Sequence, residues 1–313
     1  MRSFPLRSVA GATAGFATYL IVAHFTFGNR PEQFVLCSLM YAACVWSDRS
    51  RRFFRGMLPF VLFGIAFDCL KLIKPGLPGL DVQVSWPYLL DKALFGVGFG
   101  AARISLGEYF AIHHAPAIDF VCGLVYLLYV YLSTGLALYL VLAGGATKER
   151  LVIRYGWTFF FVNIAAYVTY MMFPVAPPWY VACHGLGPAD LGARPSAAAL
   201  IRWDQLTGVS CFATLYARGS DVFGSVPSLH CAYPMITFLY GRELRQPWLN
   251  AALLAFWATV VFSAVYLQHH YVLDTLLGTA YAFAGWRIER ALTSETSLTT
   301  DNRAVANIVG GAV

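Results

Sequence analysis

Apolar residues recur in long runs along almost the whole chain instead of alternating with polar positions. A helix that spans a membrane needs roughly 20 predominantly apolar residues. Eight runs approach that length, although the second and sixth are short enough to leave a six- or seven-span arrangement open. The runs cover residues 8–27, 32–47, 57–73, 118–143, 153–174, 228–241, 247–267 and 270–290. The pattern predicts an all-α polytopic membrane protein with about eight transmembrane helices.

The composition agrees with this fold class. Of the 313 residues, 58% are hydrophobic and only 12% are charged, whereas a soluble domain carries about 25% charged residues. The net charge of +6 includes no basic block interleaved with aromatic residues, so the sequence gives no reason to expect a nucleic-acid partner. The seven cysteines show neither CxxC nor metal-ligand spacing, so we expect no metal and no cofactor.

The basic residues predict the orientation in the membrane. Fourteen of the 22 lysines and arginines fall in segments on one side, mostly short loops such as 48–55 and 148–154. Because short cytoplasmic loops are enriched in Lys and Arg, both termini are expected in the cytoplasm. The long loops 74–117 and 175–227 then face the other side. That side is the periplasm if the protein lies in a bacterial inner membrane, or the lumen if it lies in a eukaryotic Golgi membrane.

The chain is expected to form one membrane-embedded domain. This domain covers residues 1–292, and the polar segment 293–313 is expected to be a disordered cytoplasmic tail. Long loops within a compact protein are usually functional. The second long loop, 175–227, leads directly into the "SVPSLH" stretch at 225–230, which directs attention to that membrane face.

Two stretches place histidines at predicted helix starts. They are "SVPSLH" (225–230), where His230 opens the sixth span, and "HHYVLD" (269–274), where His270 opens the eighth. The two histidines are separated by 40 residues, which corresponds to two membrane passes of about 20 residues each. The chain therefore crosses the membrane and returns, and both histidines are expected at the same membrane face.

The residues around this pair predict a metal-free phosphoryl-transfer site. His270 and Asp274 are four positions apart, so on a helix they share one face. A carboxylate bound to one imidazole nitrogen fixes the tautomer and leaves the other nitrogen as nucleophile or base. His230 is suited to proton transfer, and Ser228 lies at a helix N-terminus that favours a phosphate. The alternative is that each histidine only caps a helix or bonds a loop.

These residues resemble the phosphatidic acid phosphatase type 2 superfamily. Its P-S-x-H motif corresponds to Pro227-Ser228-Leu229-His230. Its S-R-x5-H-x3-D motif corresponds to Ser263, His270 and Asp274, but alanine stands where the motif has arginine. The K-x6-R-P stretch of the first motif is absent. The resemblance implies a six-helix catalytic core over about 118–290 with an extracytoplasmic site.

The missing arginine fits one branch, the inositol phosphorylceramide synthases that are the fungal aureobasidin target, with their bacterial relatives. The chain resembles this branch in "FPVAPPWY" (173–180), "HGLGP" (184–188), "RWDQLTG" (202–208), "VFGSVPSLH" (222–230) and "YLQHHYVLD" (266–274), and more weakly in "YLLDKALFG" (88–96). The resemblance implies that His270 forms a phospho-histidine, that Asp274 orients it and that His230 is the general acid and base. The implied reaction moves phosphoinositol from phosphatidylinositol to a ceramide-type lipid alcohol.

Substrate contacts are less sharply indicated. Asp204 is a candidate either for binding inositol hydroxyls or for structuring its loop. The phosphate charge needs a cation on the outer side, and Arg218 and Lys92 are our first choices, each with the alternative of anchoring a lipid head group or a loop. The cations considered for this role are Lys71, Lys74, Lys92, Arg103, Arg202 and Arg218.

Several other polar residues have structural interpretations. His113 and His114 are interpreted as interfacial, and Asn163 as a contact between helices. Asp68 lies inside the third span, where an acid is functional by default, but Lys71 three residues later offers a local ion pair. A disulfide between Cys183 and Cys211 is as compatible with the sequence as two free thiols.

Two alternative functions follow from the same residues. If water attacks in place of a lipid alcohol, the protein is a metal-independent lipid phosphate phosphatase or phospholipase. If the histidines are structural, the protein is a transporter or scaffold, although the chain has no repeat of broken helices that would support a transporter. No obligate protein partner is inferred.

Overall fold

The computed structural model describes residues 6–26, 28–73, 81–217, 219 and 222–310. Within these ranges the chain forms α-helices, short 3-10 helices and three isolated β-bridges. A long helix lies at each of the eight places where the apolar pattern predicts one. These helices are α1 (Leu6–Thr26), α2 (Pro31–Val45), α3 (Asp48–Ile73), α6 (Pro116–Ala143), α7 (Ala146–Met172), α11 (Leu229–Gly241), α12 (Pro247–Tyr266) and α13 (Val272–Gly310). The all-α fold class is confirmed.

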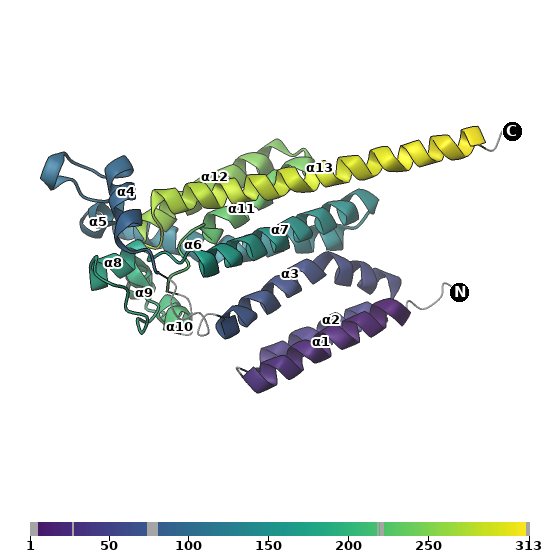
Figure 1. The fold of residues 1–313 in the computed structure, drawn as a ribbon, viewed down its shortest axis with the longest axis horizontal. Coiled ribbons are helices and arrows are strands. Elements are labelled where there is room, and N and C mark those ends of the chain that lie inside the picture. Colours follow the sequence, from purple (N-terminus) through teal and green to yellow (C-terminus); the bar gives the residue numbers. More distant parts are fainter. Residues whose placement is uncertain (1–5, 27, 74–80, 218, 220–221, 311–313) are drawn as a thin grey trace.

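The long helices lie roughly alongside one another, and the short helices form a cap at one end (Figure 1). The cap is built by the two long loops and consists of α4 (Ser85–Phe95), α5 (Leu106–Ile112), α8 (Pro178–His184), α9 (Ile201–Thr207) and α10 (Cys211–Ala217). The marked ends of the chain lie at the opposite end of the bundle. The even number of long helices thus leaves both ends on one side, as the sequence predicts.

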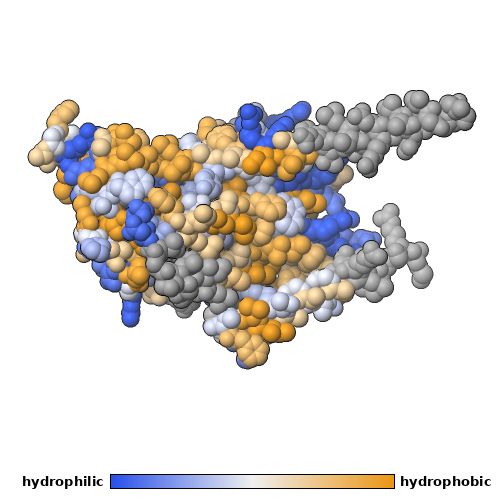
Figure 2. All heavy atoms as spheres, viewed as in Figure 1, coloured by the Kyte–Doolittle hydropathy of each residue, from blue (hydrophilic) through white to orange (hydrophobic). Residues whose placement is uncertain are grey.

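Four of the described helices, α1, α6, α7 and α12, are long and apolar enough to cross a membrane on their own. Hydrophobic side chains cover much of the outer surface of the bundle, and hydrophilic residues gather near the end opposite the cap (Figure 2). Large apolar residues such as Phe25, Leu142 and Phe161 are more than half exposed. This surface suits an integral membrane protein, in which lipid contacts these side chains.

Helix α11 lies at the centre of the bundle and is the shortest of these eight helices. Its 13 residues reach only about 20 Å, less than the roughly 30 Å hydrocarbon core. Ten of them are buried, and α6, α7, α12 and α13 surround them. Buried polar contacts join the helices: the Tyr233 hydroxyl donates to Asn163 Oδ1 (2.5 Å), and Tyr155 Oη lies 2.9 Å from Thr237 Oγ1. Asn163 therefore joins two helices, as predicted.

Asp68 ties α1, α2 and α3 together. Its carboxylate accepts hydrogen bonds from Arg30 (2.6 Å), Gln33 (3.1 Å) and the Tyr19 hydroxyl (2.8 Å). Asp68 forms an ion pair with Arg30 from the turn before α2; the side chain of Lys71, the partner that the sequence suggests, lies outside the described residues. The pairing partner is a residue 38 positions away, which local spacing cannot reveal.

The structure also bears on two expectations about the outer loop and the tail. Cys183 and Cys211 are free thiols, so this disulfide is not formed. The segment 293–313, expected to be disordered, continues α13 as a helix as far as Gly310, and residues 311–313 lie outside the described ranges.

Replacing Asp68 with alanine is expected to destabilise the α1–α3 unit. The change leaves three buried or half-buried donors without their acceptor, and such losses cost about 2–4 kcal/mol. Thermal unfolding in detergent should show a lower midpoint than wild type. The matched control is Asp48→Asn in the exposed Asp48–Arg51 pair, which should change stability by less than about 1 kcal/mol. Equal midpoints for D68A and D48N would contradict this role for Asp68.

Candidate active site

The starts of α11 and α13 meet beneath the cap. The backbone N–H of Ser228 donates to the carbonyl oxygen of Asp274 (3.0 Å). Gly278, one turn further along α13, packs directly on Ser228: a Cβ at Gly278 would lie 2.0 Å from the Ser228 carbonyl oxygen. Only glycine allows this approach, so two segments far apart in sequence are held in a fixed register.

His230, His270 and Asp274 form a continuous hydrogen-bonded chain. His230 Nδ1 lies 3.0 Å from His270 Nε2, and His270 Nδ1 lies 3.3 Å from Asp274 Oδ2. His270 is 5% exposed and Asp274 is 1% exposed. The two histidines therefore lie at the same face of the bundle, as counting the passes predicts. Because a carboxylate accepts at Nδ1, the assigned tautomer of His270 has its proton on Nδ1 and a lone pair on Nε2.

Asp274 is held by more than His270. Its Oδ2 also accepts from the Ser225 hydroxyl and from the backbone N–H of Tyr271 (3.0 Å). These hydrogen bonds fix the carboxylate so that it cannot rotate away from the imidazole. Ser225, in the loop before α11, was not singled out from the sequence. The signal was its place in "FGSVPSLH", five residues before His230.

Two tyrosines fix the His230 ring. Tyr126 stacks on it with ring centroids 4.3 Å apart and planes 17° apart, and Tyr129 contacts it at 4.6 Å. Both tyrosines come from α6, which packs against α11. The contacts leave the ring little freedom except along the direction of His270. Sequence analysis did not single out these two tyrosines; the available signal is their spacing of three residues on one predicted span, which is also typical of ordinary helix packing.

His269 connects the site to the outer loop. Its Nε2 lies 3.2 Å from the carbonyl oxygen of Ala197, and its ring stacks on Tyr216 at 4.9 Å. Burial, together with the nearby charge of His270, lowers the pKa of His269 to about 3. The ring is therefore neutral at physiological pH and serves as a fixed polar contact.

The turn between α12 and α13 sets the orientation of His269 and His270. Gln268 has φ of +63°, a left-handed conformation that is uncommon for a residue other than glycine. Both following N–H groups, of His269 and His270, donate to the carbonyl of Ala264 (3.1 and 3.0 Å). The Gln268 carbonyl accepts the backbone N–H of Trp179 at 3.0 Å, so the cap helix α8 supports this turn.

Asp91 braces the start of α13 from the cap. It lies on α4, is 2% exposed, and accepts hydrogen bonds from the backbone N–H groups of Leu273 (3.2 Å) and Val272. Burial raises the pKa of Asp91 to about 6, and the charge of Asp274 adds to the rise, while the two N–H groups oppose it. The sequence drew attention to "DKALFG" but favoured Lys92; it is the adjacent acid that contacts the helix of Asp274.

Of the four predicted substrate-binding residues, the structure describes Ser228, Asp204 and Lys92. Ser228 is fully buried, with its hydroxyl 3.5 Å from Cys231 Sγ. The Asp204 carboxylate accepts the backbone N–H groups of Phe212 (3.0 Å) and Ala213 (2.8 Å), which is the loop-structuring alternative. Arg218 lies outside the described residues.

Lys92 is half-buried, and its Nζ lies 3.3 Å from the Tyr88 hydroxyl. Tyr88 in turn donates to Glu108 (2.8 Å) and packs against Tyr271, the residue after His270. Lys92 is therefore linked to the site through two aromatic rings. Of the other outer cations, Arg202 pairs with Asp119 at 2.8 Å, whereas the side chains of Lys71 and Lys74 are not described.

The second histidine pair lies elsewhere on the cap side. His114 Nδ1 is 3.3 Å from Asp119, which also accepts from Arg202 and the Tyr266 hydroxyl, and His113 stacks on Tyr109 at 4.2 Å. Their exposure agrees with the interfacial interpretation. Within the described ranges, no group of three or more His, Cys, Asp or Glu side chains is arranged to hold a metal ion.

Comparison with known proteins links this geometry to a family. A family model described as "PAP2 superfamily" matches residues 103–288, which contain all three residues of the hydrogen-bonded chain. The chain is 34% identical over 274 residues to the phosphoinositol dihydroceramide synthase of Bacteroides thetaiotaomicron, covering 86% of this chain and 87% of that protein.

Fungal relatives match more narrowly. The inositol phosphorylceramide synthase of Candida albicans is 29% identical over 82% of this chain and 53% of its own length. The inositol phosphorylceramide synthase catalytic subunit of Saccharomyces cerevisiae is 32% identical over 39% of this chain and 30% of its own length. No solved structure matches.

The raised pKa of Asp91 predicts a pH-dependent stability. Between about pH 4, the ordinary aspartate range, and pH 6, the folded protein holds the Asp91 proton more tightly than the unfolded chain does. Stability contributed by this group therefore falls as pH rises through that window. Asp91→Asn keeps an acceptor oxygen for α13 but cannot ionise. Wild type should lose stability relative to this variant between pH 4 and pH 7, measured by thermal unfolding at a series of pH values.

The matched control is Asp81→Asn, an exposed aspartate on the cap. Its unfolding midpoints should follow those of wild type at every pH. Asp91→Ala, which removes the acceptor, should lower the midpoint across the whole range, since a lost helix cap costs about 1 kcal/mol. A constant difference between wild type and D91N from pH 4 to pH 7 would contradict the role assigned to Asp91.

Proposed function

The chain belongs to the PAP2 superfamily, and we propose that it is a membrane phosphotransferase of the inositol phosphorylceramide synthase type. The proposed reaction moves phosphoinositol from phosphatidylinositol to the hydroxyl of a ceramide or dihydroceramide and releases diacylglycerol. The proposed catalytic core covers about 118–290, within the membrane-embedded domain 1–292. The head group and the acceptor rest on the printed names of the relatives, foremost the bacterial one that matches most of the chain.

One observation carries the chemistry: His270 presents Nε2 to His230 while Asp274 holds its other nitrogen. An imidazole with its proton fixed on Nδ1 has a basic lone pair on Nε2, which is the requirement for a nucleophile. A second imidazole 3.0 Å away can deliver or take the proton that the reaction needs. Two histidines that only cap helices would not require His270 to face His230 with one ring nitrogen and Asp274 with the other.

The first proposed step breaks the bond to diacylglycerol. His270 Nε2 attacks phosphorus, and the P–O bond to the diacylglycerol oxygen breaks as the N–P bond forms. His230 enters this step as the imidazolium and gives one of its two N–H protons to the departing oxygen, so diacylglycerol leaves as a neutral alcohol and His230 becomes neutral. Asp274 stabilises the positive charge that develops on the His270 ring. The phosphate displaces the direct contact between the two histidines, since it must lie between them.

The second proposed step regenerates the enzyme. His230, now neutral, takes the proton from the acceptor hydroxyl. That oxygen attacks phosphorus, the N–P bond breaks, and the electron pair returns to His270 Nε2. Proton and phosphoryl group are both accounted for, and the product is a phosphoinositol lipid. Attack by water would give inositol phosphate instead and would make the protein a hydrolase.

We also propose that the histidine site faces the periplasm or an organelle lumen. The site lies at the cap end of the bundle, and both ends of the chain lie at the other end. The short basic loops, which favour the cytoplasm, are on the side of the chain ends.

The function is tested with purified protein, phosphatidylinositol labelled in the inositol ring, EDTA, and either dihydroceramide or no acceptor. Labelled sphingolipid should appear only with the acceptor and in step with diacylglycerol release. His270→Ala should reduce this transfer by at least about 1,000-fold, the scale seen when a nucleophile is removed from a linked set. Gel filtration shows that the variant stays folded.

The other outcomes are equally informative. Release of water-soluble inositol phosphate irrespective of the acceptor would assign the protein as a hydrolase. Full transfer by His270→Ala would contradict the nucleophile. Turnover of a different glycerophospholipid in preference to phosphatidylinositol would contradict the head group while leaving the histidine chemistry in place.

Gly278→Ala is expected to inactivate without unfolding. Its Cβ would lie 2.0 Å from the Ser228 carbonyl, so α13 must move away from the segment that carries His230. A displacement of about 1 Å between reacting groups costs about 100-fold in rate. The control is Gly135→Ala on α6, where an added Cβ meets nothing within 4 Å. Similar transfer rates for the two variants would show that this helix contact does not set the site geometry.

A further inference from the structure

A lipid-sized groove lies between α7 and α13, on the half of the bundle away from the histidines. Its volume is about 780 Å³, and its walls are almost entirely apolar. Trp157, Phe161 and Ala165 line it from α7; Tyr281, Ala284 and Ile288 line it from α13. Gly285 forms its floor, where the helices approach so closely that a Cβ would lie 2.5 Å from Val162.

The length of the groove matches one leaflet of a bilayer. Its lining residues run from 153 to 165 on α7 and from 281 to 293 on α13. Twelve residues of helix rise about 18 Å, whereas half of a 30 Å hydrocarbon core is about 15 Å. The groove therefore accommodates a lipid chain from the leaflet opposite the histidine site and ends where a head group would lie.

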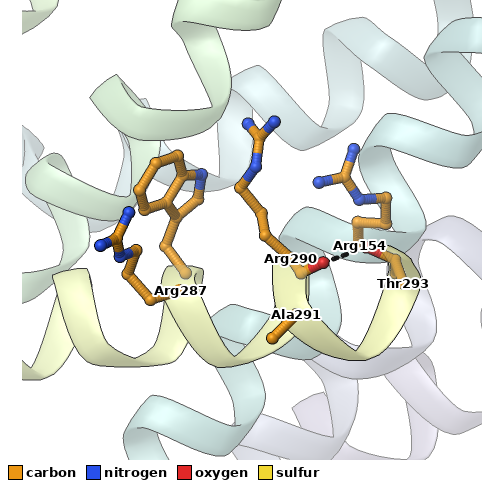
Figure 3. Close-up of a pocket in the computed structure, with 6 residues that line it drawn as sticks. Arg154, Arg287, Arg290, Ala291 and Thr293 are labelled. Atoms are coloured by element: carbon orange, nitrogen blue, oxygen red, sulfur yellow. Dashed lines mark hydrogen bonds between the residues drawn. The ribbon is translucent and has the colours of Figure 1, made fainter. Parts of the chain in front are cut away.

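A basic pocket closes this end of the groove. It has a volume of about 580 Å³ and is lined by Arg154, Arg287 and Arg290, shared between α7 and α13 (Figure 3). Arg154 and Thr293 line both the pocket and the groove, so the two adjoin at these residues. In Figure 3 the Arg154 and Arg290 side chains extend in the same direction from the two helices.

The arginines are only partly neutralised. Arg154 is bound by both oxygens of Glu289 (2.7 and 2.9 Å) and by Glu243 (3.1 Å). Arg290 reaches Glu243 only at 3.7 Å and lies over the Trp286 ring. No carboxylate among the described residues pairs with Arg287, which is exposed. The three arginines and two glutamates leave one net positive charge at the mouth of the groove.

We propose that this groove and pocket bind one phospholipid with an anionic head group. An acyl chain fills the apolar groove, and the phosphate lies against Arg287 and Arg290, where the indole N–H of Trp286 also has no partner among the described residues. Basic pockets between helices are established head-group sites in membrane proteins. The lipid braces α7 against α13, the helix whose other end carries Asp274. This site is separate from the proposed transfer reaction and does not depend on it.

The test is lipid retention by the delipidated, purified protein, measured by native mass spectrometry. Phosphatidylglycerol and phosphatidylcholine with identical acyl chains are titrated in parallel. Wild type should bind one phosphatidylglycerol about tenfold more tightly than phosphatidylcholine, the preference expected of one or two uncompensated arginines. The double variant R287Q/R290Q should lose that preference. The control R150Q should keep it, because Arg150 is an exposed arginine near the same end of α7 that lines neither the pocket nor the groove.

A second variant tests the groove separately from the charge. Ala284→Phe fills the apolar channel and should weaken binding of both lipids. Equal binding of the two lipids by wild type, or an unchanged preference in R287Q/R290Q, would overturn the proposal. So would a wild-type dimer that A284F converts to a monomer, because the groove would then be covered by a second copy of the chain.

Discussion

The arrangement at the cap end depends on one residue, Asp274, through both its side chain and its backbone. The side chain orients His270 and accepts the Ser225 hydroxyl and the Tyr271 N–H. The backbone carbonyl accepts the N–H of Ser228, two residues before His230. One residue thus sets the angle of one histidine and the distance of the other. Gly278 makes this possible by letting α13 lie against Ser228 without a side chain between them.

A buried carboxylate is costly unless its acceptor capacity is used. Asp274 meets this condition with three donors, but it lies beside a second buried acid, Asp91, whose pKa is raised by burial and by Asp274 itself. Asp91, on α4, accepts a backbone N–H at the start of α13 and so stabilises this end of the helix. The cap therefore covers the site and also fixes the start of α13, the helix that carries the Asp274 carboxylate.

The sequence predicts the helices and the meeting of the two histidines. It does not predict which side chains pair when they are far apart in the chain. Long apolar runs locate the eight main helices, and counting passes brings His230 and His270 to one face. Spacing alone could not reveal that Arg30, 38 positions away, pairs with Asp68. It could not distinguish Lys92 from Asp91 as the contact to α13, since adjacent residues on a short helix point in different directions. Nor could it reveal that Asp204 is occupied by two N–H groups of its own loop.

The surroundings of the histidines favour transfer over hydrolysis. A phospho-histidine survives long enough to meet a lipid alcohol only where water is excluded. His270 is 5% exposed, His230 lies between two tyrosine rings, and the outer loop is held over the site by His269. Backbone hydrogen bonds beside it join Gln83 to Pro174 and Ala176, and the Val175 N–H to the Phe223 carbonyl oxygen. Under the proposed mechanism, this enclosure would protect the phospho-histidine from water and so favour a lipid alcohol as the acceptor.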